Sequence, residues 1–307
     1  MRLFFSAAGL AAALLAVVAC GDDSTGGFTA DVEAGAEGSV SGEDAGPPPD
    51  PTPGCGATGV KPGFNGSQTI TVGGESRTYE LYVPEAYDGK KVYPVVLLFH
   101  GQGGTGAGMR NTFAIEAESQ GGAIFVYPDG VGRTWRFDNA TGLAADVGFV
   151  DAIVDSIGKT LCADKKRLFG VGYSRGAYFT NMLACLSTSG FRAVATHAGG
   201  GPFGVDGSGT KYDNSGNLVC PAAPVAALQV QGTNDGAVPP SEGTKAREHW
   251  QRANGCAATT TPYDPSPCVA HDGCAPERPE IWCLIPGLGH TIWQNGVKAT
   301  WDFLKTK

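Results

Sequence analysis

The sequence predicts an α/β protein in which helices cover both faces of a mostly parallel β-sheet. Continuous apolar runs recur along the chain, as expected for strands that are buried on both faces. Stretches of helical length separate these runs, so strands and helices alternate. The 307 residues are 42% hydrophobic and 17% charged, which is enough apolar material for one large domain.

The expected elements follow one another in a simple order. Residues 68–72 and 78–83 alternate apolar and polar side chains on either side of a Gly-Gly pair, which predicts an N-terminal β-hairpin with one solvated face. Buried strands are expected at 95–99, 123–127, 167–171, 193–196, 225–230 and 280–285. Helices are expected at 107–119, 146–161, after Ser174, at 241–254 and at 296–304. This alternation predicts a three-layer sandwich with a mostly parallel central sheet.

The N-terminal part of the chain differs in composition from the rest. Arg2 precedes an apolar run that ends at Val18, which predicts a secretory signal over residues 1–19, with a transmembrane helix as the alternative. Residues 17–21 (VVACG) resemble a bacterial lipobox, which implies that Cys20 carries lipid and is the membrane contact of an exported protein. Residues 20–54 are expected to form a disordered acidic tether before a folded domain at 55–307.

The negative charge of the chain is concentrated in that tether. Residues 21–54 hold eight carboxylates and no Lys or Arg, whereas the whole chain has a net charge of −8. The remaining domain is therefore close to neutral. We expect no nucleic acid partner, because such partners require a basic surface.

The cysteine content indicates disulfides and no metal site. If Cys20 is lipidated, eight cysteines remain, and an even number in an exported chain predicts disulfides whose pairing cannot be derived from spacing. They are Cys55, Cys162, Cys185, Cys220, Cys256, Cys268, Cys274 and Cys283. None of them forms a Cys-x-x-Cys pair with the spacing of a structural zinc site, so no metal and no other cofactor is expected.

A Gly-x-Ser-x-Gly pattern places a candidate nucleophile at Ser174. The pattern spans residues 172–176 and lies between the expected strand 167–171 and the following helix, which is the position that a nucleophile elbow requires. Its glycines relieve crowding at a sharp turn that raises the serine hydroxyl above the sheet. Alone, the pattern is also typical of an ordinary Gly-rich turn.

A serine hydroxyl needs a base, and five histidines compete for that role. His290 lies in a loop after the last expected strand, which is the usual position of the base. His197 is the main competitor, although a structural role fits it better. The other three lie in a loop after an earlier strand, on a helix face and in a Cys-rich loop: His100, His249 and His271.

Asp235 completes a predicted triad. It follows strand 225–230 and therefore lies at the same edge of the sheet as the elbow, although an Asp before Gly is also common in turns. The chain order Ser174, Asp235, His290 is that of α/β-hydrolases. We therefore predict nucleophile, acid and base in that order.

The loop after strand 95–99 is expected to help stabilise an oxyanion. The backbone N–H of Arg175, directly after the nucleophile, would act together with that of Gly101 or Gln102. The same loop, Gly101–Gly106, also matches the Gly-x-Gly-x-x-Gly pattern of dinucleotide-binding proteins. That alternative leaves the predicted triad unexplained, and an exported protein has little access to a soluble nicotinamide cofactor.

From about Cys55 to the C-terminus, the chain resembles carbohydrate esterase family 1 and the related poly(3-hydroxybutyrate) depolymerase-like group, which includes feruloyl and acetylxylan esterases. The resemblance is carried by the serine elbow and by short motifs at 53–56 (PGCG), 77–79 (RTY), 127–130 (YPDG), 146–151 (DVGFVD), 231–235 (QGTND) and 289–291 (GHT). It implies the same triad and the same oxyanion loop. The chain departs from the family at Gln231, where a His is common, and after Thr291, where Trp-Pro is common.

The resemblance also implies disulfide pairs and a substrate. It implies Cys55–Cys220 and Cys162–Cys185, with two further bridges among the last four cysteines, whose pairing stays open. Trp135, Tyr173 and Trp293 are expected to line an acyl pocket for an aromatic acid such as ferulate, with core positions as the alternative.

The predicted activity is hydrolysis of carboxylic esters through an acyl-serine intermediate, with feruloylated or acetylated plant polysaccharide as the expected substrate. Three alternatives remain open. They are a polyhydroxybutyrate depolymerase, an acyltransferase with the same fold, and a non-catalytic surface binding protein.

Overall fold

The computed structural model describes residues 48–202, 218–220 and 222–307. The predicted signal segment, Cys20 and most of the acidic tether lie outside the described residues. In the part of the chain that is described, no helix has the length and apolar character needed to cross a membrane.

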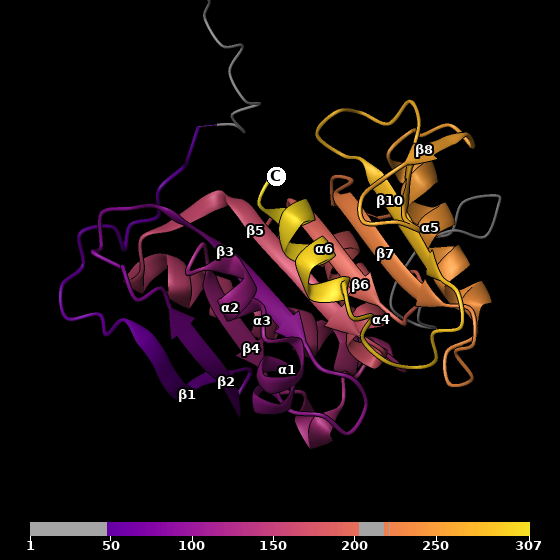
Figure 1. The fold of residues 1–307 in the computed structure, drawn as a ribbon. Coiled ribbons are helices and arrows are strands. Elements are labelled where there is room, and N and C mark those ends of the chain that lie inside the picture. Colours follow the sequence, from indigo (N-terminus) through magenta and orange to yellow (C-terminus); the bar gives the residue numbers. More distant parts are fainter. Residues whose placement is uncertain (1–47, 203–217, 221) are drawn as a thin grey trace, which may run out of the picture. The chain divides into compact units, whose positions relative to one another are not determined.

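The described residues contain one ten-stranded sheet with the strand order β1-β2-β4-β3-β5-β6-β7-β10-β9-β8 (Figure 1). The first five strands are β1 Gly63–Val72, β2 Glu75–Val83, β3 Tyr93–Phe99, β4 Ile124–Pro128 and β5 Ala163–Tyr173. The other five are β6 Ala193–His197, β7 Ala226–Gly232, β8 Thr260–Pro262, β9 Val269–His271 and β10 Glu280–Ile285.

The centre of the sheet is parallel and its edges are antiparallel. β4, β3, β5, β6, β7 and β10 pair in parallel, whereas β1 and β2 form an antiparallel hairpin at one edge and β9 and β8 add antiparallel strands at the other. Every residue of β3, β4, β6 and β7 is buried, which explains why apolar side chains predominate in these strands. The α/β fold with a mostly parallel sheet and an N-terminal hairpin is thus confirmed.

Helices cover both faces of the sheet (Figure 1). They are α1 Gly106–Phe113, α2 Ile115–Ser119, α3 Ala140–Thr160, α4 Arg175–Leu186, α5 Pro240–Ala253 and α6 Gly296–Leu304, with a short 3₁₀ turn at Val131–Arg133. One apolar core contains side chains of α3, α4 and α5, and a second contains side chains of α1, α2 and α6. The loops at the carboxyl ends of β3, β5, β7 and β10 therefore share one edge of the sheet.

Two helices differ from the sequence-based expectation. The helix expected at 107–119 is divided at Ala114, whose φ of 46° ends α1 and precedes α2. α3 begins at Ala140, six residues before the expected start, because the side chain of Asn139 accepts a hydrogen bond from the N–H of Gly142 and caps the helix there. Strands β8 and β9 were not expected, since each has only three residues.

The ordered domain begins before the expected boundary at residue 55. The N–H of Asp50 donates to Asp164 Oδ1 over 3.0 Å, and Pro51 forms an isolated bridge with Asp164. The hydroxyl of Thr52 donates to the carbonyl of Leu161 over 2.6 Å. Residues 50–54 were expected as the end of the tether. They pack against the start of β5 instead, because their backbone and side-chain polar groups form hydrogen bonds there.

All eight cysteines of the domain form disulfides, but two of the implied pairs were wrong. The observed bridges are Cys55–Cys162, Cys185–Cys220, Cys256–Cys274 and Cys268–Cys283. The implied pairs Cys55–Cys220 and Cys162–Cys185 do not form, because Cys162 lies beside the packed N-terminal segment and Cys185 lies in the last turn of α4. The four bridges indicate a protein that works outside the reducing cytoplasm.

Candidate active site

Ser174 occupies a strained turn between β5 and α4. Its φ of 54° and ψ of −122° lie outside the favoured regions for a residue with a side chain, and its N–H is held by the carbonyl of His197 over 2.9 Å. A Cβ atom on Gly176 would lie 2.1 Å from the carbonyl oxygen of Phe99. A Cβ on Gly172 would lie 2.3 Å from the carbonyl oxygen of Gly176. Both glycines of the motif are therefore required by close backbone approach.

The structure brings together the three residues of the predicted triad. The Nε2 atom of His290 lies 2.9 Å from Ser174 Oγ, and its Nδ1 lies 2.8 Å from Asp235 Oδ2. With Nδ1–H donating to the carboxylate, Nε2 is free to accept the serine proton. The hydroxyl, imidazole and carboxylate thus form a continuous hydrogen-bonded chain.

Asp235 is held as an anion by the loop that carries it. Its Oδ1 accepts the N–H groups of Ala237 and Val238 over 2.9 and 2.8 Å, and Gln231 Nε2 lies 3.3 Å from Oδ2. Burial works against ionisation, but the hydrogen bond from His290 and the two backbone N–H groups outweigh it and lower the pKa of Asp235. The buried carboxylate can therefore orient His290 and stabilise its protonated form.

His197 is a structural residue. It is almost fully buried, its Nε2 hydrogen-bonds to Thr300 Oγ1 over 2.9 Å, and burial lowers its pKa to about 3. The histidine that competed with His290 on sequence grounds therefore stays neutral. It positions Ser174 through its backbone carbonyl.

His100 fixes the loop that lies against Ser174. Its Nε2 accepts the N–H of Gly130 over 3.0 Å, so its Nδ1 carries the proton and donates to the carbonyl of Gly101 over 2.8 Å. Burial lowers the pKa of His100, so it keeps this neutral form. A Cβ on Gly101 would lie 3.2 Å from the Cβ of Ser174, so the loop approaches the nucleophile closely.

A cavity of about 520 Å³ opens onto the nucleophile. It is lined by Gln102, Phe137, Ser174, Arg175, Tyr178, Ala237, Val238 and Glu242. Gln102 and Arg175, two of the predicted oxyanion residues, thus share the cavity with the serine. Arg175 is the first residue of α4, where backbone N–H groups have no partner within the helix, so its N–H is available to an oxyanion.

Comparison with known proteins shows the family of the chain. The chain is 31% identical over 269 residues to a probable feruloyl esterase C of Aspergillus niger, covering 82% of this chain and 90% of the relative. A feruloyl esterase D of Neurospora crassa is 28% identical, with 82% and 89% covered. No model of a protein family matches the chain. The chain belongs to the feruloyl esterase family of carbohydrate esterases.

Solved structures support the same fold. An acetyl xylan esterase from Aspergillus awamori has a TM-score of 0.59 at 18% identity, covering 78% of this chain and 99% of that one. A family 1 ferulic acid esterase from Anaeromyces mucronatus, solved with ferulic acid, has a TM-score of 0.51 at 18% identity, with 81% and 92% covered. The structures show the α/β-hydrolase fold, and the feruloyl esterase relatives show that the protein is a carboxylic ester hydrolase.

The two tryptophans expected in the esterase's acyl pocket lie in the core instead. Trp135 is fully buried, stacks on Phe179 at 4.6 Å between ring centroids, and donates its indole N–H to the carbonyl of His100 over 2.8 Å. Trp293 is also buried, in the core beneath α6. The pocket expectation was wrong for both, and core positions, the stated alternative, hold, because burial keeps both side chains away from a surface cleft. Trp135 thereby supports the loop that begins at His100.

Tyr173 is the expected pocket residue that does lie beside the triad. Its hydroxyl donates to the carbonyl of His290 over 2.9 Å, and the two rings are 5.2 Å apart. It lines a separate hollow of about 200 Å³ on the α1 side, together with Met109 and Ile292. Tyr173 therefore holds the base and borders this second hollow.

Besides Ala237 and Val238, which follow Asp235 closely, sequence reasoning missed three residues of the esterase's main cavity. Phe137, Tyr178 and Glu242 line it but belong to no short motif. A signal for Tyr178 was present, because it lies four residues after Ser174 and therefore on the same face of α4. Glu242 could have been sought in the first turn of α5, the helix that follows Asp235.

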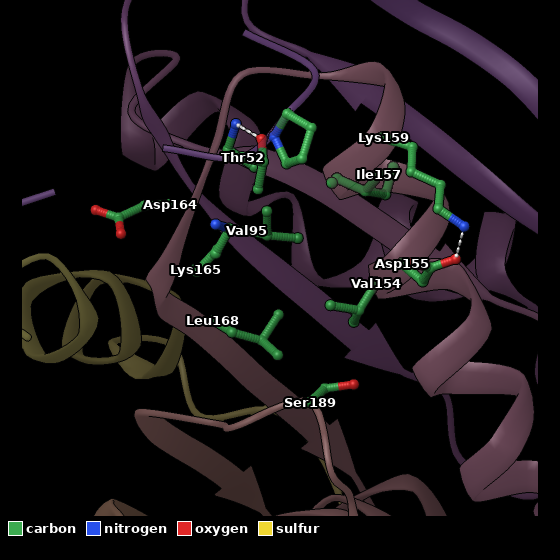
Figure 2. Close-up of a pocket in the computed structure, with 13 residues that line it drawn as sticks. Thr52, Val95, Val154, Asp155, Ile157, Lys159, Asp164, Lys165, Leu168 and Ser189 are labelled. Carbon is green, nitrogen blue, oxygen red and sulfur yellow. Dashed lines mark hydrogen bonds and ion pairs between the residues drawn. The ribbon is translucent and has the colours of Figure 1, made fainter. Parts of the chain in front are cut away.

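A further cavity of about 400 Å³ lies near the amino-terminal ends of β3 and β5, away from the strand ends that carry Ser174. Figure 2 shows the apolar side chains of Val95, Val154 and Leu168 around it, with the ion pair of Lys159 and Asp155 beside them. The residues that line it include no histidine, so no general base of the kind next to Ser174 is present. This cavity is separate from the esterase site.

The last glycine of the loop 101–106 is required by close packing. A Cβ on Gly106 would lie 2.2 Å from the carbonyl oxygen of Tyr127, and the Gly106 N–H donates to Asp129 Oδ1 over 2.8 Å. Asp129 also accepts the hydroxyl of Thr78. In the described ranges, no cluster of three His, Cys, Asp or Glu side chains could hold a metal ion.

Proposed function

We propose that this protein is an extracytoplasmic serine esterase that removes acyl groups, feruloyl above all, from plant polysaccharide through an acyl-serine intermediate. The observation that carries the proposal is the hydrogen-bonded chain from Ser174 through His290 to Asp235 at a strained elbow. The names of the feruloyl esterase relatives support the choice of acyl group. The four disulfides support a site of action outside the cytoplasm.

In the first half of the reaction, Ser174 Oγ attacks the ester carbonyl carbon while His290 Nε2 takes the hydroxyl proton. The carbonyl oxygen becomes an oxyanion that accepts the N–H of Arg175 and one N–H from Gly101 or Gln102. The intermediate then breaks the bond to the alcohol oxygen. His290 gives its proton to that oxygen, and the sugar leaves as an alcohol.

In the second half, water replaces the alcohol. His290 removes a proton from the water molecule, whose oxygen attacks the acyl carbon, and the same oxyanion site holds the developing charge. The intermediate collapses, Ser174 recovers the proton from His290, and the carboxylic acid is released. Asp235 stabilises the imidazolium in both halves, since its carboxylate stays ionised.

Replacement of Ser174 by Ala tests the mechanism. We expect turnover of nitrophenyl acetate and methyl ferulate to fall by a factor on the order of 10⁴ to 10⁶, with little change in the unfolding midpoint. Ser67→Ala, at an exposed position of β1, is the matched control and should keep full activity. Turnover retained by Ser174→Ala would exclude the serine mechanism.

A substrate comparison tests the acyl group and its carrier. Release of ferulate from feruloylated arabinoxylan, acetate from acetylated xylan and hydroxybutyrate from polyhydroxybutyrate would be measured with one enzyme preparation. We expect ferulate release to have the highest kcat/KM. Faster release of hydroxybutyrate would assign the protein to polyester hydrolysis, and transfer of the acyl group to an added glycoside in place of water would assign it to acyl transfer.

We also propose that lipid on Cys20 holds the esterase at the cell envelope, with residues up to about 50 as the acidic tether. The motif VVACG after an apolar run supports this. In a bacterial host, Cys20→Ser should move the active protein from the membrane fraction to the soluble fraction. An unchanged distribution would contradict lipid anchoring and leave the catalytic proposal untouched.

A further inference from the structure

The cavity above Ser174 contains a carboxylate that the mechanism does not use. Glu242 lies in the first turn of α5 and lines the same cavity as the nucleophile. Its Oε2 accepts the hydroxyl of Tyr178 over 3.2 Å, and its Oε1 accepts the ammonium of Lys245 over 2.5 Å. Because Glu242 shares the cavity with Ser174, a substrate bound at Ser174 can contact its carboxylate.

The walls between Ser174 and Glu242 are aromatic. Tyr178 lies on α4, one helical turn after Ser174. Its ring extends from α4 toward Glu242, and its hydroxyl contacts the Glu242 carboxylate. The ring of Phe137 lies 6.2 Å from that of Tyr178, and the guanidinium of Arg175 covers Phe137 at 4.1 Å. These contacts hold Phe137 and Tyr178 in place as flat apolar surfaces suited to a planar aromatic acyl group.

We propose that Glu242 accepts a hydrogen bond from the phenolic hydroxyl of a bound hydroxycinnamoyl group and thereby selects 4-hydroxylated aromatic acyl groups. The inference rests on the proposed function, because it places the acyl carbon at Ser174. The aromatic ring then lies along Tyr178 and Phe137, and its far end reaches Glu242.

The carboxylate has capacity for this additional bond. An ionised carboxylate offers about four lone-pair sites, and Tyr178 and Lys245 take one each in the contacts described above. Tyr178 stays protonated and donates to Glu242, because burial and the nearby charge of Glu242 raise its pKa. A substrate hydroxyl therefore finds an acceptor whose position is already fixed.

The expected selectivity is moderate. A hydrogen bond to a charged group contributes about 1.5–3 kcal/mol, which corresponds to roughly 10- to 150-fold in kcat/KM. Glu242 is partly exposed, with 27% of its side chain accessible, so water can solvate it when a substrate lacks the hydroxyl. We therefore expect a preference near the lower end of that range.

The experiment compares three methyl esters that differ only at the 4-position of the ring. They are methyl 4-hydroxycinnamate, methyl cinnamate and methyl 4-methoxycinnamate, which carry a donor, no substituent and an ether without a donor. The intact enzyme should prefer the hydroxylated ester by about tenfold over both others. Glu242→Leu should reduce that ratio to about one, and Glu242→Gln, which keeps the shape but not the charge, should give an intermediate value.

Glu248→Leu is the matched control, because Glu248 lies on the same helix but does not line the cavity. It should keep the tenfold ratio. An unchanged ratio in both Glu242 variants would overturn the inference, as would an equal preference of the intact enzyme for all three esters. If Glu242→Leu instead lowers turnover of sugar-linked esters while the ratio stays unchanged, the carboxylate binds a sugar hydroxyl and the inference is wrong.

Failure of this inference can be distinguished from failure of the proposed function. Nitrophenyl acetate carries no cinnamoyl ring, so its hydrolysis reports the triad without Glu242 selectivity. An enzyme that hydrolyses nitrophenyl acetate but ignores the 4-hydroxyl contradicts only the inference. An enzyme that hydrolyses no ester contradicts the proposed function itself.

Discussion

At the scale of single residues, backbone crowding around the nucleophile limits what the sequence can contain. Ser174 adopts a positive φ, and the chain before and after it passes within van der Waals contact of the β3 carboxyl end. A side chain at Gly172 or Gly176 would overlap backbone atoms, which cannot move as a flexible side chain can. The conformation that exposes the hydroxyl thus depends on two missing Cβ atoms.

A pair of glycine substitutions tests this dependence. Gly176→Ala should lower kcat/KM at least 100-fold and destabilise the fold by about 1–3 kcal/mol, because its Cβ would lie 2.1 Å from the Phe99 carbonyl oxygen. Gly148→Ala, inside α3 with no atom within 4 Å of the new Cβ, should instead stabilise by about 0.5–1 kcal/mol and keep activity. Urea unfolding and ester turnover measure both effects, and a harmless Gly176→Ala would contradict the crowding argument.

Asp235 provides a second test at this scale. Asp235→Asn keeps the size of the side chain but replaces an acceptor of the His290 Nδ1–H by an uncharged amide, so the imidazole is no longer held in the productive tautomer. We expect kcat to fall by about 10³- to 10⁴-fold at pH 7, while KM changes little. Full activity of the Asn variant would show that another group orients His290.

At the scale of elements, local pattern predicted strands and helices well where they are buried or amphipathic. The strand Glu280–Ile285 and the helix Gly296–Leu304 have the expected bounds, and the other central strands agree within a few residues. The short strands β8 and β9 were missed, since three residues show no periodicity. The division at Ala114 was also missed, because nothing in that residue type indicates a positive φ.

The strand β10, next to the antiparallel strands β9 and β8, begins with an acidic group whose ionisation opposes folding. Glu280 begins β10 fully buried, neither of its carboxylate oxygens has a hydrogen-bond partner among the described residues, and His271 Nε2 lies 3.5 Å away. Burial raises its pKa to about 8, although the charge of Arg247 acts in the opposite direction. The folded protein therefore binds a proton here that the unfolded chain releases near pH 4.5.

The sign of the resulting pH dependence follows from linkage. Between about pH 4.5 and 8 the folded state holds more protons than the unfolded state, so stability falls as pH rises, by at most about 1.4 kcal/mol per pH unit. Glu280→Gln keeps the shape and removes the titration, so the variant should lose this slope and exceed the original protein in stability at pH 8. Urea unfolding at pH 5, 6.5 and 8 measures it. Parallel curves for the two proteins would contradict a raised pKa.

At the scale of the whole domain, the meeting of the three candidate catalytic residues was predictable and the cavity was not. Ser174, Asp235 and His290 follow three strands whose carboxyl ends share one edge, so chain order alone predicts that they meet. Whether an aromatic residue lines a cleft depends on packing between distant elements, which placed Trp135 in the core and left Tyr178 in the cavity. The disulfide pairs depend on the same long-range contacts, and two of the implied pairs were wrong for that reason.

The four disulfides close loops of different length, and this difference predicts unequal contributions to stability. Cys55–Cys162 spans 107 residues and joins the packed segment around Thr52 to the start of β5, whereas Cys268–Cys283 spans 15. In the chain-entropy description a bridge stabilises by restricting the unfolded chain, more strongly for a longer loop. Replacing both Cys55 and Cys162 by Ala should therefore cost about 4–5 kcal/mol, and replacing Cys268 and Cys283 about 3 kcal/mol.

Equilibrium unfolding in urea of the two double variants and the original protein measures the difference. Only the variant that lacks the Cys55–Cys162 bridge should also have a larger m-value. Its unfolded chain is no longer closed into the long loop, so it expands further and exposes more surface. Esterase activity of the folded variants acts as the control, since the Cys55–Cys162 bridge lies at the start of β5 and Ser174 follows its end. If loss of the short bridge costs as much as loss of the long one, native packing around Cys268, and not loop length, sets the stabilisation.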